Sequence, residues 1–248
     1  MMRRMLITGA SRGIGADISK KFADKYELYL HYNNGQEEAE RIASSILSEG
    51  GKVKLIQADL ATQDGAEIIA DHIRRDGSKL DVLINNAGIF QKGMAIENID
   101  WDIMSSLFTV NVFSAIKLTS LCLSFLPKTT QSNIIFLSSM ATRLSLPDLA
   151  IYTATKAAIE SFMRSFAKGL GPIRVNAIAP GVVPTGIHQQ RFDVDKKEQE
   201  KKLLDVFKEE SLTKNLGTTE QINSTVDYIL NNDNFTGEII HIHGGLGI

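Results

Sequence analysis

This chain has little cysteine and no segment with the composition of an interdomain linker. Among its 248 residues the single cysteine is Cys122, so no disulfide can form within the chain. This excludes a small disulfide-stapled scaffold and is typical of a protein in a reducing compartment. No Pro-, Gly- or Ser-rich linker divides the sequence. With 43% hydrophobic residues, the chain is too apolar for disorder and long enough to bury a large core.

A strong charge of one sign and a long apolar run are also missing. The net charge is −2, which does not indicate a nucleic-acid-binding protein, and no block of like charges resembles a binding tail. No segment approaches the ~18 uncharged apolar residues that a membrane span needs. Arg3 and Arg4 precede an apolar run that is far too short for a signal-peptide core. We therefore expect a cytoplasmic protein without nucleic-acid or membrane partners.

Short β-type segments alternate with longer helical patterns along the whole chain. Mostly apolar strands are expected at 5–7, 28–32, 53–56, 80–85, 133–137, 173–178 and 238–242. Such strands, separated by helices, predict a parallel sheet that is covered on both faces. The economical prediction is one α/β domain over residues 1–248, with a Rossmann-type, doubly wound sheet of about seven parallel strands.

Helical patterns are expected at 14–22, 36–48, around 68–73, at 106–126 and at 151–170. The segment 186–216 differs, because it begins irregularly and contains a dense run of charged residues. Leu203, Leu204 and Phe207 then follow at helical spacing. The charges indicate a solvated helix face. An amphipathic helix inserted here would be placed to form a short lid over a substrate pocket.

A glycine-rich turn, Thr8-Gly-Ala-Ser-Arg-Gly-Ile-Gly15, follows the first strand and leads into a helix. Glycines allow the backbone to turn tightly and to approach a ligand. The helix N-terminus offers free N–H groups and a positive dipole end, which suit a diphosphate. The spacing Gly-x-x-x-Gly-x-Gly differs from the general dinucleotide fingerprint. A tight structural turn could need the same glycines, so this turn alone does not identify a cofactor site.

The end of the second strand distinguishes NAD from NADP. An acidic residue there binds the ribose hydroxyls of NAD and repels a 2′-phosphate. This chain has His31-Tyr-Asn-Asn34 instead, and no carboxylate before Glu37. Arg12, in the glycine-rich turn, supplies a cation that can pair with a phosphate. NADP(H) is therefore the expected cofactor, and NAD(H) is less favoured.

Tyr152 and Lys156 begin the helix at 151–170 and lie on one face of it, because they are four residues apart. A nearby cation favours the ionised form of a tyrosine, whose pKa is normally ~10. We therefore expect Lys156 to lower the pKa of Tyr152 and to make it an acid–base group. The segments 85–88 and 138–139 end neighbouring strands at the carboxyl edge, where open α/β sheets bind ligands. These polar groups should meet beside the glycine-rich turn.

With these residues in place, the sequence resembles the short-chain dehydrogenase/reductase family along nearly its whole length. It is most similar to the 3-oxoacyl-acyl-carrier-protein reductases and related enzymes. Each matching segment is modest alone, but their order and spacing make the set specific. The segments are Thr8–Gly15, Asp59-Leu60, Asn85-Asn-Ala-Gly88, Asn111, Ser138-Ser139, Tyr152-x-x-x-Lys156 and Asn176-Ala-Ile-Ala-Pro-Gly181.

The resemblance implies a role for each matching residue. Tyr152 would donate a proton to a carbonyl, Lys156 would bind the nicotinamide ribose, and Ser139 would hydrogen-bond the substrate oxygen. Asn111 would hold a water molecule of the proton relay. No metal is expected, because the five histidines show no ligand spacing. The residues implied to contact the cofactor, besides Tyr152 and Lys156, are Gly9, Ser11, Arg12, Gly13, Ile14, Gly15, Asn33, Asp59, Leu60, Asn86, Ala87, Gly88, Pro180, Gly181, Val183 and Thr185.

The sequence departs from the carrier-protein reductases where their acidic partner docks. Segments 129–132 and 171–172 lack the basic residues that often stand there, which weakens the expectation of an acyl-carrier partner. The first hypothesis is an NADP(H)-dependent carbonyl reductase, acting on a small molecule or a 3-oxoacyl thioester of fatty acid biosynthesis. The alternatives are a sugar, polyol or other small-alcohol dehydrogenase, and a non-catalytic NADP(H)-sensing protein. Relatives are usually homotetramers or homodimers, and the helix at 106–126 is the expected contact surface.

Overall fold

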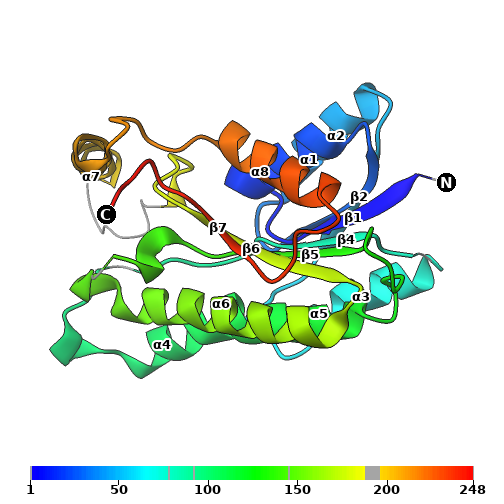
Figure 1. The fold of residues 1–248 in the computed structure, drawn as a ribbon, viewed down its shortest axis with the longest axis horizontal. Helices are drawn as coiled ribbons and strands as arrows, with labels where there is room; N and C mark the ends of the chain where they lie inside the picture. The colour runs from blue at the N-terminus through cyan, green and yellow to red at the C-terminus, as the bar shows by residue number, and fades with distance from the viewer. Residues whose placement is uncertain (1, 78, 92, 145, 188–195, 248) are drawn as a thin grey trace.

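One seven-stranded sheet runs through the molecule (Figure 1). The structure is a computed structural model that describes residues 2–77, 79–91, 93–144, 146–187 and 196–247. All neighbouring strands are parallel, in the order β3-β2-β1-β4-β5-β6-β7. This confirms the predicted doubly wound fold. The strands are β1 Arg3–Ile7, β2 Tyr26–Tyr32, β3 Lys52–Gln57, β4 Val82–Asn85, β5 Asn133–Leu137, β6 Arg174–Pro180 and β7 Ile239–Ile242.

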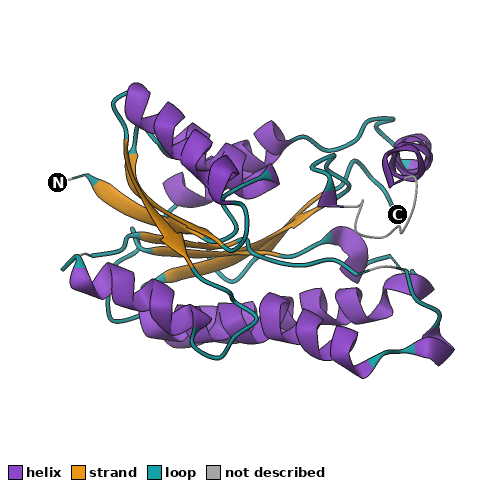
Figure 2. Ribbon diagram, turned by 180° about the vertical axis from the view of Figure 1, so that it is seen from behind, coloured by secondary structure: helices purple, strands orange, loops and turns teal. Residues whose placement is uncertain are grey.

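Helices cover both faces of this sheet (Figure 2). One layer contains α1 (Gly13–Phe22), α2 (Gln36–Ser48) and α8 (Thr219–Asn231). The opposite layer contains α3 (Gly65–Arg75), α4 (Trp101–Phe108), α5 (Ser114–Cys122) and α6 (Ala150–Leu170). Each layer buries its own hydrophobic cluster against the sheet, and β5 and β6 are buried along their whole length. Continuous burial on both faces explains why these strands are apolar runs without alternation.

The order of the strands places a crevice at the carboxyl edge. Successive strands run outward from β1 to β2 and β3, and from β4 toward β7 in the other direction. The loops that follow β1 and β4 therefore leave the sheet on opposite faces and separate from each other. Ligands of open α/β sheets bind at this kind of switch point.

The helix expected at 106–126 begins earlier and is interrupted. It begins at Trp101, because the Asp100 side chain accepts a hydrogen bond from the Ile103 N–H at 2.9 Å and caps the first turn. A π-helical turn, Thr109–Phe113, separates α4 from α5. Among the described residues, the stretch Trp101–Cys122 is the one helix long and apolar enough to cross a membrane, whereas the sequence was expected to contain no such segment. Its Leu118 and Cys122 are packed in the core, while Trp101 and Phe113 are exposed.

Helix α8 was not predicted from the sequence. Its N-terminus carries a capping box, in which Thr218 and Gln221 each hydrogen-bond the other's backbone N–H. Ile222, Val226 and Ile229 follow at helical spacing and are buried. Both signals are visible in the sequence, so this helix could have been recognised there.

Helix α7 (Lys196–Glu210) confirms the amphipathic helix expected in the insertion. Phe207 is buried against Met140, Val182 and Leu246, with Leu203 and Leu204 packed beside it. Residues 188–195 of the predicted lid segment lie outside the described part of the chain. Helix α7 stands at the same end of the sheet as the switch-point crevice (Figure 1).

Candidate active site

A cavity of about 750 Å³ opens at the carboxyl edge of the sheet. It extends from the end of β2, past the glycine-rich turn, to the beginning of α6 and to α7. Eighteen of the twenty predicted site residues line it; only Gly15 and Asn111 do not. The eighteen are Gly9, Ser11, Arg12, Gly13, Ile14, Asn33, Asp59, Leu60, Asn86, Ala87, Gly88, Ser139, Tyr152, Lys156, Pro180, Gly181, Val183 and Thr185.

The glycine-rich turn forms a close-fitting cradle at one end of the cavity. Gly9 and Gly13 have positive φ values of 65° and 59°, which favour glycine. A Cβ atom on Gly13 would lie 3.1 Å from the Cβ of Thr185. The N-terminus of α1 has no side-chain cap and no acidic residue in its first turn, so no side chain there would compete with an anion for its N–H groups. These features fit the diphosphate of a dinucleotide.

Asn86 and Gly15 stabilise the conformation of this turn. The side-chain amide of Asn86 donates to the carbonyl oxygens of Thr8 and Gly9 at 2.8 and 3.0 Å. A Cβ atom on Gly15 would collide with the Gly9 carbonyl oxygen. Gly15 therefore permits close helix–turn packing and does not itself line the cavity.

His31 also supports the cradle, and the sequence did not indicate this. Its Nδ1 accepts a hydrogen bond from the Gly9 N–H at 3.2 Å, while Nε2 lies 3.1 Å from the Ala58 carbonyl oxygen. Burial lowers the pKa of His31 to about 4. The ring is therefore neutral at physiological pH, with Nε2 protonated. It connects the glycine-rich turn through β2 to the residue after β3.

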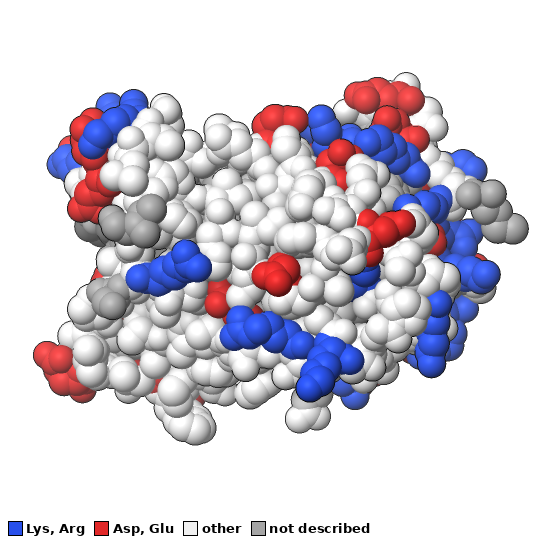
Figure 3. Space-filling model, in the orientation of Figure 1, with Lys and Arg blue, Asp and Glu red and all other residues white. Residues whose placement is uncertain are grey.

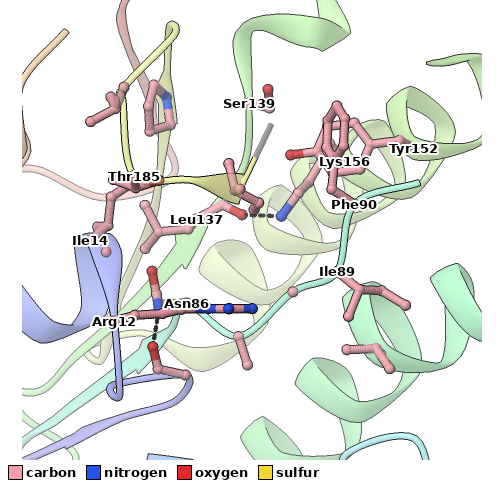
Figure 4. A pocket seen from close by; sticks show the side chains of 18 of the residues that line it. Arg12, Ile14, Asn86, Ile89, Phe90, Leu137, Ser139, Tyr152, Lys156 and Thr185 are labelled. Carbon is pink, nitrogen blue, oxygen red and sulfur yellow. Dashed lines mark hydrogen bonds between the residues drawn. The ribbon is translucent and has the colours of Figure 1, made fainter. Parts of the chain in front are cut away.

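The adenosine end of the cavity contains both polar and acidic residues. Asn33 donates its side-chain amide to Asp59 at 3.0 Å. Arg12 is exposed and lines the cavity, and its side chain lies beside Asn86 (Figure 4). Glu38, in the first turn of α2, also lines the cavity but is paired with Arg41 at 3.3 Å. The sequence around β2 did not indicate that this carboxylate lines the cavity.

Ser139, Tyr152 and Lys156 meet at the other end of the cavity (Figure 4). The Ser139 hydroxyl accepts a hydrogen bond from the Ala141 N–H at 3.1 Å, which fixes the turn after β5. The ammonium group of Lys156 donates to the Leu137 carbonyl oxygen at 2.9 Å. Tyr152 is buried, with the ring of Phe90 edge-on to it at 4.6 Å between centroids. One helix and one strand end thus present a phenol, an ammonium and a hydroxyl to one space.

The expected lowering of the Tyr152 pKa is wrong for this structure. Burial raises the pKa of Tyr152 to about 12, and a hydrogen bond with Ser139 opposes only part of that rise. Burial also lowers the pKa of Lys156 to about 8. Desolvation disfavours the charged form of each group. The phenol is therefore held protonated.

Asn111 lies behind the site, on the π-helical turn. Its side-chain oxygen accepts from the Ile89 N–H at 2.8 Å, and its amide donates to the Ile89 carbonyl and the Thr155 hydroxyl at 3.0 and 3.2 Å. These bonds join the segment after β4 to α6. The π-helical turn is the local distortion that directs this amide inward.

Glu160 is a second supporting residue that the motifs did not indicate. It lies on α6 one turn beyond Lys156 and is buried. One of its carboxylate oxygens accepts hydrogen bonds from the hydroxyls of Ser138 and Thr142, at 2.6 and 3.1 Å. The turn that contains Ser139 is therefore tied to the helix that carries Tyr152. Among the described residues, no group of three or more His, Cys, Asp or Glu side chains could hold a metal ion.

This chain is similar to proteins of one family in both sequence and fold. The family model for short chain dehydrogenases matches residues 3–196. The 3-oxoacyl-acyl-carrier-protein reductase FabG of Staphylococcus aureus (strain Mu50) is 31% identical over 258 residues, covering 99% of this chain and 98% of that protein. A short-chain dehydrogenase/reductase from Serratia marcescens BCRC 10948 has a TM-score of 0.87 and 28% identity, with 99% and 98% of the two chains covered.

A second solved structure resembles this one equally well and contains a nucleotide. It is a short chain dehydrogenase from Burkholderia cenocepacia J2315 in complex with NADP, with a TM-score of 0.87, 26% identity and coverage of 100% and 99%. The similarities extend over essentially the whole chain, and the motif residues come together at one cavity. This chain belongs to the short-chain dehydrogenase/reductase family of oxidoreductases.

Proposed function

We propose that the protein reduces a ketone to a secondary alcohol, with NADPH as the reductant. The observation that carries this proposal is the buried, protonated Tyr152 beside Ser139 and Lys156, at the end of a cavity with a diphosphate cradle. A bound NADPH would supply the hydride. The protein's own residues would orient the carbonyl and deliver a proton to its oxygen.

The three residues have distinct roles in this proposal. Ser139 donates a hydrogen bond to the carbonyl oxygen and stabilises the negative charge that develops there. Tyr152 transfers its phenolic proton to the same oxygen. Lys156, as a cation, stabilises the phenolate that remains and binds the ribose of the cofactor. The water-holding role of Asn111 remains part of the proposal.

The preference for NADPH rests on the end of β2. Asn33 and Asn34 line the cavity where an acidic residue would repel a 2′-phosphate, and Arg12 offers a cation. Glu38 is the residue that opposes this preference, although Arg41 compensates its charge. The NADP complex of the Burkholderia relative supports the same cofactor.

The experiment is a fluorescence titration of the purified protein with NADPH and NADH, followed by a carbonyl screen. We expect NADPH to bind at least tenfold more tightly, and Arg12→Ala to remove most of that difference. Tyr152→Phe should bind NADPH normally but lose about 10²- to 10⁴-fold in kcat/KM. An active Tyr152→Phe variant would contradict the mechanism, and equal binding of both nucleotides would contradict the cofactor assignment.

Two finer expectations remain proposals. A 3-oxoacyl thioester is one substrate that the staphylococcal relative's name suggests. We also propose that the protein is cytoplasmic. We propose a homodimer or homotetramer as well, because Trp101, Ile103 and Phe113 are exposed along the α4–α5 stretch. Light scattering of the protein and of Phe113→Lys tests the contact surface; an unchanged mass for the variant would place the contact elsewhere.

A further inference from the structure

Two separate hydrophobic clusters meet at the turn after Ser139. We name them by the helix that each contains. The α7 cluster consists of Met140, Val182, Phe207 and Leu246, with Leu144, Leu203, Leu204 and Leu216 packed against them. The α4 cluster consists of Leu107, Ala141 and Tyr152, with Ile89, Phe90 and Ile151 packed against them.

The neighbouring residues Met140 and Ala141 belong to different clusters. The turn that begins at Ser139 is therefore the junction between the two. Helices α7 and α4 stand on opposite sides of this end of the molecule (Figure 1). A carbonyl oxygen bonded to Ser139 and Tyr152 would lie between the two clusters.

Each cluster presents apolar side chains to the cavity. Phe207 and Leu144 of the α7 cluster line it, and so do Phe90 and Ile89 of the α4 cluster. Phe207 is 8% exposed, so α7 covers this part of the cavity. A carbonyl carbon held at Ser139 therefore has an apolar surface next to each of its two substituents.

Charged groups are concentrated at the opposite end. Among the described lining residues, Arg12, Glu38 and Asp59 lie near the glycine-rich turn and the ends of β2 and β3, whereas Lys156 is the one charged residue beside Tyr152. On the face shown in Figure 3, a basic side chain lies between α7 and α4, and charged side chains gather more densely at the far end of the molecule. A carboxylate or a polyhydroxylated chain placed between the two clusters would lose hydrogen bonds to water without replacement.

We propose that the substrate is a neutral ketone with an apolar group on each side of its carbonyl carbon. This inference rests on the proposed reductase function and specifies its substrate class. One group packs against Phe207 in the α7 cluster, and the other packs against Phe90 in the α4 cluster. Aldehydes, keto acids and sugars lack one or both of these groups.

Two isomeric ketones test the proposal, because they have the same number of carbon atoms but distribute them differently around the carbonyl group. Burying one methylene group changes an equilibrium by about fourfold. Heptan-4-one carries a propyl group on each side, whereas heptan-2-one carries a pentyl group on one side only. We expect kcat/KM for heptan-4-one to equal or exceed that for heptan-2-one, and to exceed that for propan-2-one, which has four fewer methylene groups, by roughly 250-fold. A tenfold preference for heptan-2-one would overturn the two-sided site.

Variants in each cluster test the two sides separately. Phe207→Ala and Phe90→Leu should each lower the ratio of kcat/KM for heptan-4-one to kcat/KM for propan-2-one about five- to tenfold. The ratio is the readout because Phe90 packs against Tyr152, so its replacement can change the rate with both ketones. Val206→Ala is the matched control, because this neighbour of Phe207 is 51% exposed and does not line the cavity. NADPH binding confirms that each variant is folded.

The screen separates failure of this inference from failure of the proposed function. Turnover of keto acids, sugars or aldehydes in preference to every apolar ketone would leave the reductase function intact and overturn the substrate class. NADPH binding without reduction of any carbonyl would overturn the proposed function, and this inference with it.

Discussion

The ammonium nitrogen of Lys156 lies over the ring of Tyr152, 5.7 Å from its centroid. Both groups are buried, and burial favours the neutral form of each. It lowers the pKa of Lys156 to about 8 and raises the pKa of Tyr152 to about 12. Between these values Tyr152 is protonated while Lys156 has lost its charge. A proton donor and the cation that stabilises its conjugate base therefore coexist only below about pH 8.

The first prediction is a pH profile for ketone reduction. The cationic form of Lys156 is the active one, because it stabilises the phenolate that forms when Tyr152 gives up its proton. The value of kcat/KM should be constant below the Lys156 pKa of about 8 and fall about tenfold per pH unit above it. Steady-state kinetics from pH 6 to 10 measures this. Lys156→Met should be slow at every pH, and a rate that rises above pH 8 would contradict the assignment.

The second prediction concerns acid stability and His31. The pKa of His31 is about 4 in the folded protein and ~6.5 in an unfolded chain. Between these values the unfolded state binds a proton that the folded state does not, so stability falls as the pH decreases through this window. The shift corresponds to about 3 kcal/mol. Protonation would also remove the acceptor for the Gly9 N–H.

Urea unfolding of the wild type and His31→Gln, at fixed protein concentration, isolates this contribution. Groups other than His31 titrate in both proteins and cancel in the difference. The advantage of the wild type over His31→Gln should shrink by about 3 kcal/mol between pH 6.5 and 4. A difference that does not change with pH would show that His31 titrates normally in the folded state.

The strands of this fold were predictable because most are apolar runs between helical patterns, although β3 alternates lysines with apolar residues and is only partly buried. The helix boundaries were less so, since they depend on local caps such as Asp100. The π-helical turn depends on a tertiary contact, the hydrogen bonds between Asn111 and Ile89. No periodicity in the sequence indicates that contact. Helix α8 is a different case, because its capping box and apolar spacing were present and were overlooked.

The functional site also contains residues that could be predicted from the sequence and residues that could not. The motif residues that face the cavity were predictable, because their types and spacing follow from the chemistry they would perform, whereas lining residues such as Glu38 and Phe90 were not. His31 and Glu160 were not, because their partners are distant in sequence: Gly9 and Ala58 for His31, and Ser138 for Glu160. The direction of the Tyr152 pKa shift was missed for a related reason. Spacing indicates that Lys156 is near, but only the packed structure shows how deeply both residues are buried.

The third prediction is that Glu160 positions the Ser139 turn. Glu160→Leu removes the acceptor for the Ser138 and Thr142 hydroxyls and lets the turn shift. Misplacement of a catalytic group by about 1 Å can cost ~10²-fold in rate, so we expect kcat to fall 10- to 100-fold with little change in KM. Glu160→Gln keeps a carbonyl acceptor of the same reach and should retain at least a third of the wild-type kcat. If the Glu160→Leu variant lost thermal stability but kept its kcat, Glu160 would stabilise the fold without positioning the Ser139 turn.

The fourth prediction concerns Arg174, a buried cation on β6 that no site motif includes. Its guanidinium group is 2% exposed and donates to the carbonyl oxygens of Ile229 and Leu230, in the last turn of α8, at 2.5 and 3.1 Å. It also donates to the carbonyl oxygens of Thr130 and Phe235 at 2.7 and 3.1 Å. The C-terminal carbonyls of a helix lack partners within the helix, and a cation there also opposes the negative end of its dipole.

Replacing Arg174 by Met should leave these buried carbonyls without donors and lower the free energy of unfolding by about 3 kcal/mol. Arg174→Lys should recover only part of this loss, because one ammonium group cannot reach four carbonyls in the guanidinium geometry. Arg164→Met, on the exposed face of α6, is the matched control and should change stability by less than ~0.5 kcal/mol. Chemical unfolding at constant protein concentration measures all three. Equal stabilities for Arg174→Met and Arg164→Met would mean that water replaces the guanidinium group, and that α8 is held by its apolar face alone.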